Sequence, residues 1–144
     1  MKYELQTEIT IDASPEIVWD ILTDLDHYPD WNPFVVSSEG AVEVGTKLVN
    51  RMVAPGGRAM TIKPTVTAVE PGQVYEWLGH LGIPGIFDGR HRFEIEPTAT
   101  GTRFRHMEFF TGILVRPMRK MIDGSTRDGF IAFNDAIKAH AEST

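Results

Sequence analysis

The sequence predicts an α+β fold in which an antiparallel sheet packs against one long C-terminal helix. Across residues 3–110, most segments alternate apolar and polar side chains, which is typical of strands with one buried face. From residue 117 to 140 the apolar side chains recur at every third or fourth position, which indicates an amphipathic helix. We therefore expect a curved sheet of about seven strands around that helix, with two short helices after the first strand.

Length and composition favour one soluble globular domain spanning residues 1–144. The formal net charge of -6 argues against nucleic acid or an anionic membrane as a partner, since both bind basic surfaces. The chain has no cysteine, which excludes disulfides, thiol catalysis and cysteine-bound metal and fits a cytoplasmic protein. Neither a signal peptide nor a membrane span is expected, because MKYELQTEIT has no long apolar run and no stretch approaches roughly 18 apolar residues.

The first strand and the first helix have clear signals. Residues 3–11, YELQTEITI, alternate and predict a strand with one wet face. Ser14 is a favourable N-cap and Pro15 suits the first helical position, so we expect a helix over residues 15–23. The side chains expected on the buried face of the strand are Tyr3, Leu5, Thr7, Ile9 and Ile11.

Residues 24–35, DLDHYPDWNPFV, are dense in aspartates, aromatic residues and prolines. Pro29 and Pro33 prevent a long helix, which leaves room for one helical turn over residues 27–31. Three aspartates fit part of a calcium-loop pattern, but Pro29 and Val35 replace the glycine and glutamate that the pattern needs, so no metal site is expected. Helix capping and solvation of the turn are the roles expected for Asp24, Asp26 and Asp30.

The remaining strands are separated by turn-rich segments such as APGG, EPGQ and HLGIPG, which predicts an antiparallel meander. We expect these strands at residues 33–39, 46–53, 59–69, 73–80, 85–96 and 102–110. The final helix would span about 24 residues, or roughly 36 Å. Pro117 either lies in its first turn or kinks it, and Gly124 and Gly129 mark places where it passes close to a strand or lines a space.

Polar side chains are expected inside the sheet on two neighbouring strands. In IFDGRHRFEIE the charged residues occupy alternate positions, which places His91 on the inner face with the apolar set. In RFRHMEFF two arginines mark the outer face, which places His106 and Glu108 inside. The turn at residues 97–101 allows two registers, in which His91 lies opposite either His106 or Glu108.

These three residues have two interpretations. A histidine–carboxylate pair in an apolar cavity can act as a general base held in one tautomer. The same side chains can instead form a self-satisfied polar network that orients a ligand or fixes the core. Asn134 on the long helix, and Tyr75 or Trp77 on a neighbouring strand, can complete either arrangement.

Four segments resemble, in their order and spacing, the START-like or SRPBCC superfamily, and within it the polyketide cyclase/dehydrase-like group. They are SPEIVWDILTDLDHYPDWNPFV, PGIFDGRHRFEIEP, GTRFRHMEFFTGIL and RDGFIAFNDAIKAHAE. The resemblance covers nearly the whole chain and implies a helix-grip fold that binds hydrophobic ligands such as lipids, sterols, quinones and polyketides. Some members are cyclases or aromatases, so the fold alone does not decide the activity.

The resemblance implies, as the first expectation, binding of a hydrophobic small molecule without a cofactor, in a cavity between sheet and helix. The alternative is a cyclase/aromatase or dehydratase that uses His91, His106 and Glu108 as acid/base groups. In such folds a short helix sits over the cavity entrance, which implies that Trp31 is part of a lid. The spacing of Tyr28, Trp31 and Phe34 is equally typical of a core.

The expected ligand-binding side chains come from the sheet, the bend before it and the long helix. They are Trp31, Phe34, Met52, Trp77, Phe87, His91, Phe93, His106, Glu108, Phe110, Phe130, Phe133 and Asn134. Four methionines suit either an adaptable lining or ordinary core packing: Met52, Met60, Met118 and Met121. Four bulky residues can instead fill the cavity: Trp77, Phe87, Phe93 and Phe133.

Overall fold

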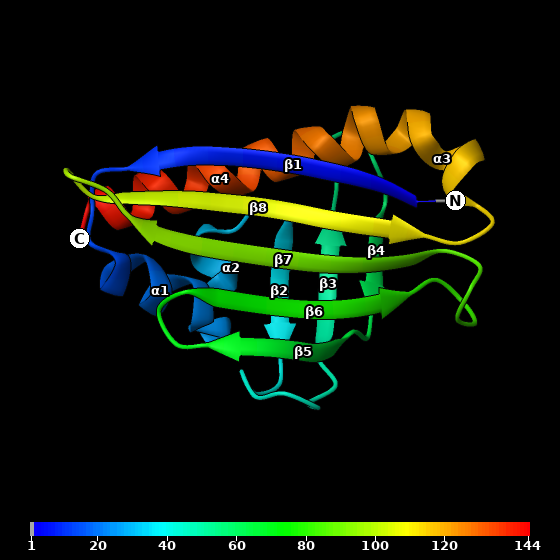
Figure 1. The fold of residues 1–144 in the computed structure, drawn as a ribbon, viewed down its shortest axis with the longest axis horizontal. Coiled ribbons are helices and arrows are strands. Elements are labelled where there is room, and N and C mark those ends of the chain that lie inside the picture. Colours follow the sequence, from blue (N-terminus) through cyan, green and yellow to red (C-terminus); the bar gives the residue numbers. More distant parts are fainter. Residues whose placement is uncertain (1) are drawn as a thin grey trace.

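The computed structural model describes residues 2–144, in which two antiparallel sheets and a C-terminal helical segment enclose the core (Figure 1). The strands are β1 Lys2–Ile11, β2 Val35–Glu39, β3 Val49–Val53, β4 Ala59–Ile62, β5 Thr65–Glu70, β6 Val74–His80, β7 Asp88–Pro97 and β8 Thr102–Thr111. The helices are α1 Pro15–Thr23, the 3-10 turn η1 Leu25–His27, α2 Tyr28–Trp31, α3 Val115–Met121, the π-helical turn η2 Ile122–Thr126 and α4 Arg127–Glu142.

The two sheets differ in size and lie in different layers. Five strands pair in the order β1-β8-β7-β6-β5 and three in the order β2-β3-β4, and every pair is antiparallel. In Figure 1 the five-stranded sheet lies in front, β2, β3 and β4 run across behind it, and α4 follows β1. The predicted α+β helix-grip fold is confirmed, with eight strands rather than about seven.

The main difference from the predicted strands lies in residues 59–69. This segment forms β4 and β5 instead of one strand, with a break at residues 63–64. Pro64 has no N–H to donate to a ladder, and its carbonyl accepts the amide of Leu48 at 2.7 Å. The strand predicted from residue 85 begins at Asp88, because the chain before it forms a loop closed by a hydrogen bond from the Leu81 amide to the Phe87 carbonyl at 2.9 Å.

The C-terminal helical segment covers residues 115–142 and is interrupted by η2. Pro117 lies in the first turn of α3, where its missing N–H costs no helical hydrogen bond. A Cβ on Gly129 would overlap the ring of Phe34, so this glycine lets Phe34 pack directly on the helix backbone. Open space lies beside Gly124, within η2.

The N-terminal elements follow the predicted pattern. Along β1 the odd-numbered side chains point into the core, and Leu5 and Ile11 are fully buried, whereas the even-numbered ones are exposed. Ser14 caps α1, because its hydroxyl accepts the amide of Ile17 at 3.3 Å. The first strand and helix are therefore positioned by the signals visible in the sequence.

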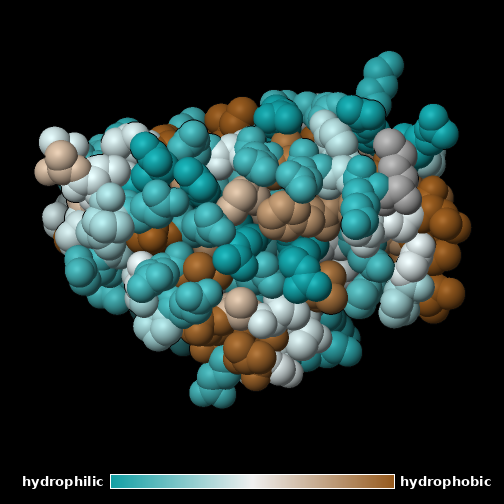
Figure 2. Space-filling view, in the orientation of Figure 1, coloured by the Kyte–Doolittle hydropathy of each residue, from teal (hydrophilic) through white to brown (hydrophobic). Residues whose placement is uncertain are grey.

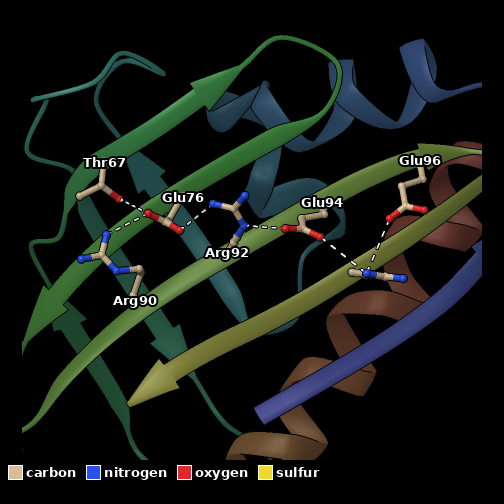
Figure 3. A network of polar contacts seen from close by, with 7 residues as sticks. Thr67, Glu76, Arg90, Arg92, Glu94 and Glu96 are labelled. Carbon is tan, nitrogen blue, oxygen red and sulfur yellow. Dashed lines mark hydrogen bonds and ion pairs between the residues drawn. The ribbon is translucent and has the colours of Figure 1, made fainter. Parts of the chain in front are cut away.

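The outer face of the five-stranded sheet carries a network of ion pairs (Figure 3). Glu76 lies at its centre and accepts hydrogen bonds from Arg90 and Arg92, each at 2.9 Å, and from Thr67 at 2.8 Å. Although burial acts to raise it, these hydrogen bonds lower the pKa of Glu76 below its ordinary value. The inner face of the same strands is mainly apolar, so the network does not extend into the core.

Candidate functional site

A cavity of about 340 Å³ lies between the two sheets and the start of the C-terminal helical segment. Its wall includes Trp77, Gly79, Phe87, Gly89, Glu108 and Phe110 from the large sheet and the loop before β7, Met52, Met60 and Ile62 from the small sheet, Met118, Met121, Ser125 and Thr126 from α3 and η2, and Phe34. Among the wall residues within 2–144, Glu108 is the only one with a carboxyl group. A mainly apolar wall with few polar groups is typical of sites for small hydrophobic ligands.

The cavity exists because the interior is filled at only one end. There, Phe93, Phe104 and Phe133 stack with ring centroids 5.3 to 6.2 Å apart. At the other end Gly79 on β6 pairs with Gly89 on β7, so neither strand has a side chain at this one pair of positions. Of the four bulky residues expected to compete for this space, two fill the core and two line the cavity: Phe93 and Phe133, and Trp77 and Phe87 respectively.

Exposed apolar side chains mark the mouth of the cavity. Met60, Leu81 and Met121 belong to the wall, yet each is 39 to 48% exposed. In Figure 2 hydrophobic surface also gathers at the right-hand end, where Figure 1 shows the loops that follow β6 and β8. The cavity therefore communicates with solvent through an apolar rim.

Glu108 brings a carboxyl group into this apolar wall. Its side chain is 14% exposed, and its Oε2 atom lies over Gly89, where any Cβ would overlap it. Burial raises the pKa of Glu108 to about 8, because an ionised carboxylate loses hydration there. At neutral pH the group is thus mainly protonated and has both a donor and acceptor sites.

A chain of buried polar side chains runs from Glu108 to α4. The Nδ1 atom of His91 lies 3.4 Å from Oε1 of Glu108, without hydrogen-bond geometry. The Nε2 atoms of His91 and His106 are 2.5 Å apart, and Nδ1 of His106 lies 3.0 Å from Oδ1 of Asn134. Nδ2 of Asn134 donates to Oγ1 of Thr7 at 2.9 Å, which connects β7, β8, α4 and β1.

Both histidines are neutral because water does not reach them. Burial lowers the pKa of His91 to about 3. Burial, and then the charge of a protonated His91, hold the pKa of His106 well below its ordinary value. The rings also stack on aromatic neighbours, His91 on Trp77 at 4.3 Å and His106 on Phe130 at 3.9 Å.

The strand register decides which of these residues meet. His91 pairs directly with Glu108, and His106 pairs with Phe93, which is the second of the two predicted registers. His91 nevertheless contacts His106, because diagonal neighbours on one face of a sheet remain within reach of long side chains. All three predicted polar residues therefore lie together.

A sequence profile describing "Polyketide cyclase / dehydrase and lipid transport" matches residues 2–142. The chain belongs to this family. A comparison with curated proteins finds no match. The family assignment agrees with the predicted START-like, or SRPBCC, resemblance.

Solved structures of similar fold come from bacteria and plants. A protein from Mesorhizobium loti is 23% identical with a TM-score of 0.76, covering 99% of this chain and 98% of its own. An aromatase/cyclase from Streptomyces is 16% identical with a TM-score of 0.79, covering 99% and 94%. Norcoclaurine synthase from Thalictrum is 18% identical with a TM-score of 0.77, covering 99% and 96%. At these identities the likeness shows a shared fold.

The thirteen residues predicted to bind a ligand fall into three groups. Six line the cavity: Phe34, Met52, Trp77, Phe87, Glu108 and Phe110. Six lie behind its wall in the filled part of the core: His91, Phe93, His106, Phe130, Phe133 and Asn134. The remaining one, Trp31, belongs to neither group.

Trp31 packs away from the cavity instead of covering it. Its ring meets Phe133 edge-on at 5.4 Å and stacks on His140 of α4 at 6.0 Å. It also contacts Tyr28 at 5.4 Å, and it is absent from the described cavity wall. Residues 27–31, expected to form a lid, therefore pack α2 against the end of α4 in this structure.

Several wall residues were not expected from the sequence. Gly79 and Gly89 create the space itself, and Ser125 and Thr126 add hydroxyl groups from η2. Of the residues expected to complete the polar chain, Asn134 joins it, whereas Tyr75 stacks on Phe93 and its hydroxyl has no hydrogen-bond partner within residues 2–144. The alternation along β7 places Gly89 inward, but only the cross-strand register links it to Glu108.

Within residues 2–144, no three His, Asp or Glu side chains are grouped so that they could hold a metal ion. No helix in the same range is both long and apolar enough to cross a membrane.

Proposed function

We propose that the protein binds a hydrophobic small molecule, such as a lipid, a quinone or a polyketide-like compound, in the cavity beside Glu108. The observation that carries this proposal is an apolar cavity of about 340 Å³ whose wall, within the described residues, has a single carboxyl group. Apolar surface supplies the affinity, because its removal from water is favourable, and the carboxyl group fixes the orientation of the ligand. The family description, which includes lipid transport, supports the same reading.

Native mass spectrometry of freshly purified protein, followed by organic extraction, tests this proposal. We expect an added mass that is lost on denaturation and recovered in the extract. As a control, Gly79→Leu should reduce the added mass, because Gly79 is part of the cavity wall, a Cβ there has only ordinary contacts at 3.7 and 3.8 Å, and the longer side chain takes up cavity space.

If the ligand is lost during purification, binding is measured instead by fluorescence titration with the uncharged probe N-phenyl-1-naphthylamine. Saturable binding that Gly79→Leu weakens is expected. Neither an added mass nor probe binding by the folded wild-type protein would refute the proposal.

An enzymatic role is the second candidate, and the polar chain behind Glu108 favours it. A protonated carboxyl group at the cavity wall can act as a general acid, and Nδ1 of His91 lies 3.4 Å from Oε1 of Glu108. If the protein cyclises or dehydrates a poly-β-ketone, His91→Phe and His106→Phe should abolish turnover while N-phenyl-1-naphthylamine still binds. Unchanged turnover in both variants would exclude the histidines from the chemistry.

A further inference from the structure

We propose that the ligand presents a hydroxyl group to Glu108, and that Thr7 and Asn134 act as positioning residues that set this preference. The inference rests on the proposed binding function and names the polar end of the ligand. It follows from the hydrogen-bond donors and acceptors along the row of buried polar side chains. Assigning each proton begins at Thr7, where the donor is fixed, and ends at the carboxyl group of Glu108. The row consists of Thr7, Asn134, His106, His91 and Glu108.

That end is the hydroxyl of Thr7. Its Oγ1 lies 2.8 Å from the backbone carbonyl oxygen of His106, which can only accept, so Thr7 donates its single proton there. Oγ1 must then accept from Asn134, which places the amide nitrogen of Asn134 toward Thr7 at 2.9 Å. A flipped amide would present a second acceptor to a hydroxyl that has no second proton.

The tautomers of both histidines follow. The oxygen of Asn134 faces Nδ1 of His106 at 3.0 Å, so this nitrogen carries the proton. His106 is neutral, and its Nε2 is therefore an acceptor. Because Nε2 of His91 lies 2.5 Å away, it must be the donor, and Nδ1 of His91 is left with a lone pair.

This lone pair decides where the proton of Glu108 lies. Nδ1 of His91 is fully buried and has no hydrogen-bond partner among residues 2–144. The nearest titratable oxygen is Oε1 of Glu108 at 3.4 Å, and a rotation of the carboxyl group that closes this gap, with the proton on Oε1, would give the lone pair its donor. Oε2, which lies over Gly89 in the cavity wall, then keeps only acceptor sites.

Glu108 thus offers the cavity an acceptor whether its carboxyl group is protonated or ionised. A hydroxyl on the ligand satisfies Oε2, whereas a ketone or ether of the same shape places a second acceptor against it. Sites built around one hydrogen-bonding role discriminate strongly, because the wrong partner leaves buried polar groups unpaired. The same argument disfavours ligands whose only polar group is a carbonyl.

Matched probes test the preference. The affinities of 2-naphthol and its methyl ether, 2-methoxynaphthalene, are measured by displacement of N-phenyl-1-naphthylamine. We expect 2-naphthol to bind about tenfold more tightly to the wild-type protein. Glu108→Leu should bring the ratio close to one, because it removes the acceptor.

The outcomes separate the two proposals. Equal binding of both probes to the wild-type protein, or tighter binding of the ether, would overturn the inference and leave the binding function standing. Failure of both naphthalenes to displace bound N-phenyl-1-naphthylamine would likewise overturn the inference, whereas the binding function falls only if N-phenyl-1-naphthylamine itself does not bind and no added mass is found.

Thr7 offers a matched pair for the positioning role. Thr7→Ser keeps the hydroxyl and should keep the affinity ratio of 2-naphthol to its methyl ether. Thr7→Val removes the hydroxyl that fixes the orientation of the Asn134 amide, and it should reduce this ratio. A ratio unchanged in folded Thr7→Val would overturn the role of Thr7. Nitrogen-15 NMR of the wild-type protein provides a second test that needs no variant: Nδ1 of His91 should be unprotonated, and a proton on that nitrogen would contradict the inference.

Discussion

The carboxyl group of Glu108 lies over Gly89, in the position that a Cβ at residue 89 would occupy. The two residues come from neighbouring strands, β8 and β7, and the absence of a side chain at one makes room for the functional group of the other. The site therefore depends on a diagonal contact between the two strands, since Gly89 itself pairs with Phe110, and glycine is required there for space.

Gly89→Ala should displace this carboxyl group without unfolding the protein, because the overlapping atoms are the end of a flexible side chain. We expect the preference for 2-naphthol to decrease while stability changes by less than about 1 kcal/mol. The matched control is Gly79→Ala on the paired strand, where a Cβ has ordinary contacts at 3.7 and 3.8 Å. Loss of probe preference in both variants alike would contradict this view of Gly89.

Glu108 should make stability fall as the pH rises toward about 8. Its pKa is raised from 4.5 to about 8, so between these two values the folded state holds a proton that the unfolded state has already released, and stability falls as the pH rises. Between pH 6.5 and 8 the loss should be roughly 2 kcal/mol, and Glu108→Gln should remove it. Urea denaturation of both proteins across this range measures the difference. Parallel pH profiles would show that Glu108 is ionised in the folded state.

The buried histidines should act in the opposite direction at lower pH. Burial lowers the pKa values of His91 and His106, so unfolded chains take up protons that folded ones do not as the pH falls below 6.5. In Glu108→Gln, urea titrations between pH 6 and 5 should show stability falling by up to about 2.7 kcal/mol per pH unit, the slope for two protons. The exposed His27 provides a control, since His27→Asn should leave the slope nearly unchanged. A slope near zero would contradict the neutral, buried state of the pair.

Trp31→Ala should reduce stability and leave ligand affinity almost unchanged. The ring packs on Phe133 and His140 outside the cavity wall, so its removal leaves a void between α2 and α4. We expect a loss of about 2–4 kcal/mol in urea denaturation, with affinity for N-phenyl-1-naphthylamine within twofold. Phe34→Ala is the comparison, because Phe34 lines the cavity and its loss should weaken binding. Weaker binding at full stability in Trp31→Ala would restore the lid interpretation.

Glu76→Gln should destabilise the protein more than a comparable change at the edge of the same network. Glu76 is almost buried and accepts hydrogen bonds from two arginines, of which Arg90 is 44% exposed, so a loss of about 1–2 kcal/mol is expected in urea denaturation. Glu96→Gln is the control, because Glu96 is 44% exposed and its ion pairs with Arg103 and Arg105 are 3.7 and 3.6 Å long. Equal losses in both variants would show that burial of Glu76 adds nothing.

Sequence patterns were sufficient for the fold and for the inward placement of the polar residues. Alternation along β7 and β8 placed His91, His106 and Glu108 on the inner face, since the other face is charged throughout in β7 and carries two arginines in β8. The long helix followed from its spacing, but the π-helical turn η2 did not, because its residues carry no pattern distinct from an α-helix. Pro64 marks the break between β4 and β5, although the apolar residues on either side of it are typical of one continuous strand.

The details of the site depended on information that the sequence did not contain. The turn between β7 and β8 allowed two registers, and only the observed one sets Glu108 opposite His91 and beside Gly89. Trp31 has the same spacing from Tyr28 and Phe34 whether it covers a cavity or packs against a helix. Which half of the interior is empty depends on packing of aromatic rings from several strands and α4, which no single segment reveals.

The ionisation of Glu108 tests the central claim most directly. Carbon-13 NMR of the side-chain carboxyl carbon is followed from pH 5 to 9, first in the free protein and then with 2-naphthol. We predict a midpoint near pH 8 in the free protein, from the raised pKa of Glu108, and a resonance that shifts when 2-naphthol binds. A midpoint near the ordinary value of 4.5, with no response to 2-naphthol, would contradict the assignment of Glu108 as the polar anchor of a hydrophobic binding site.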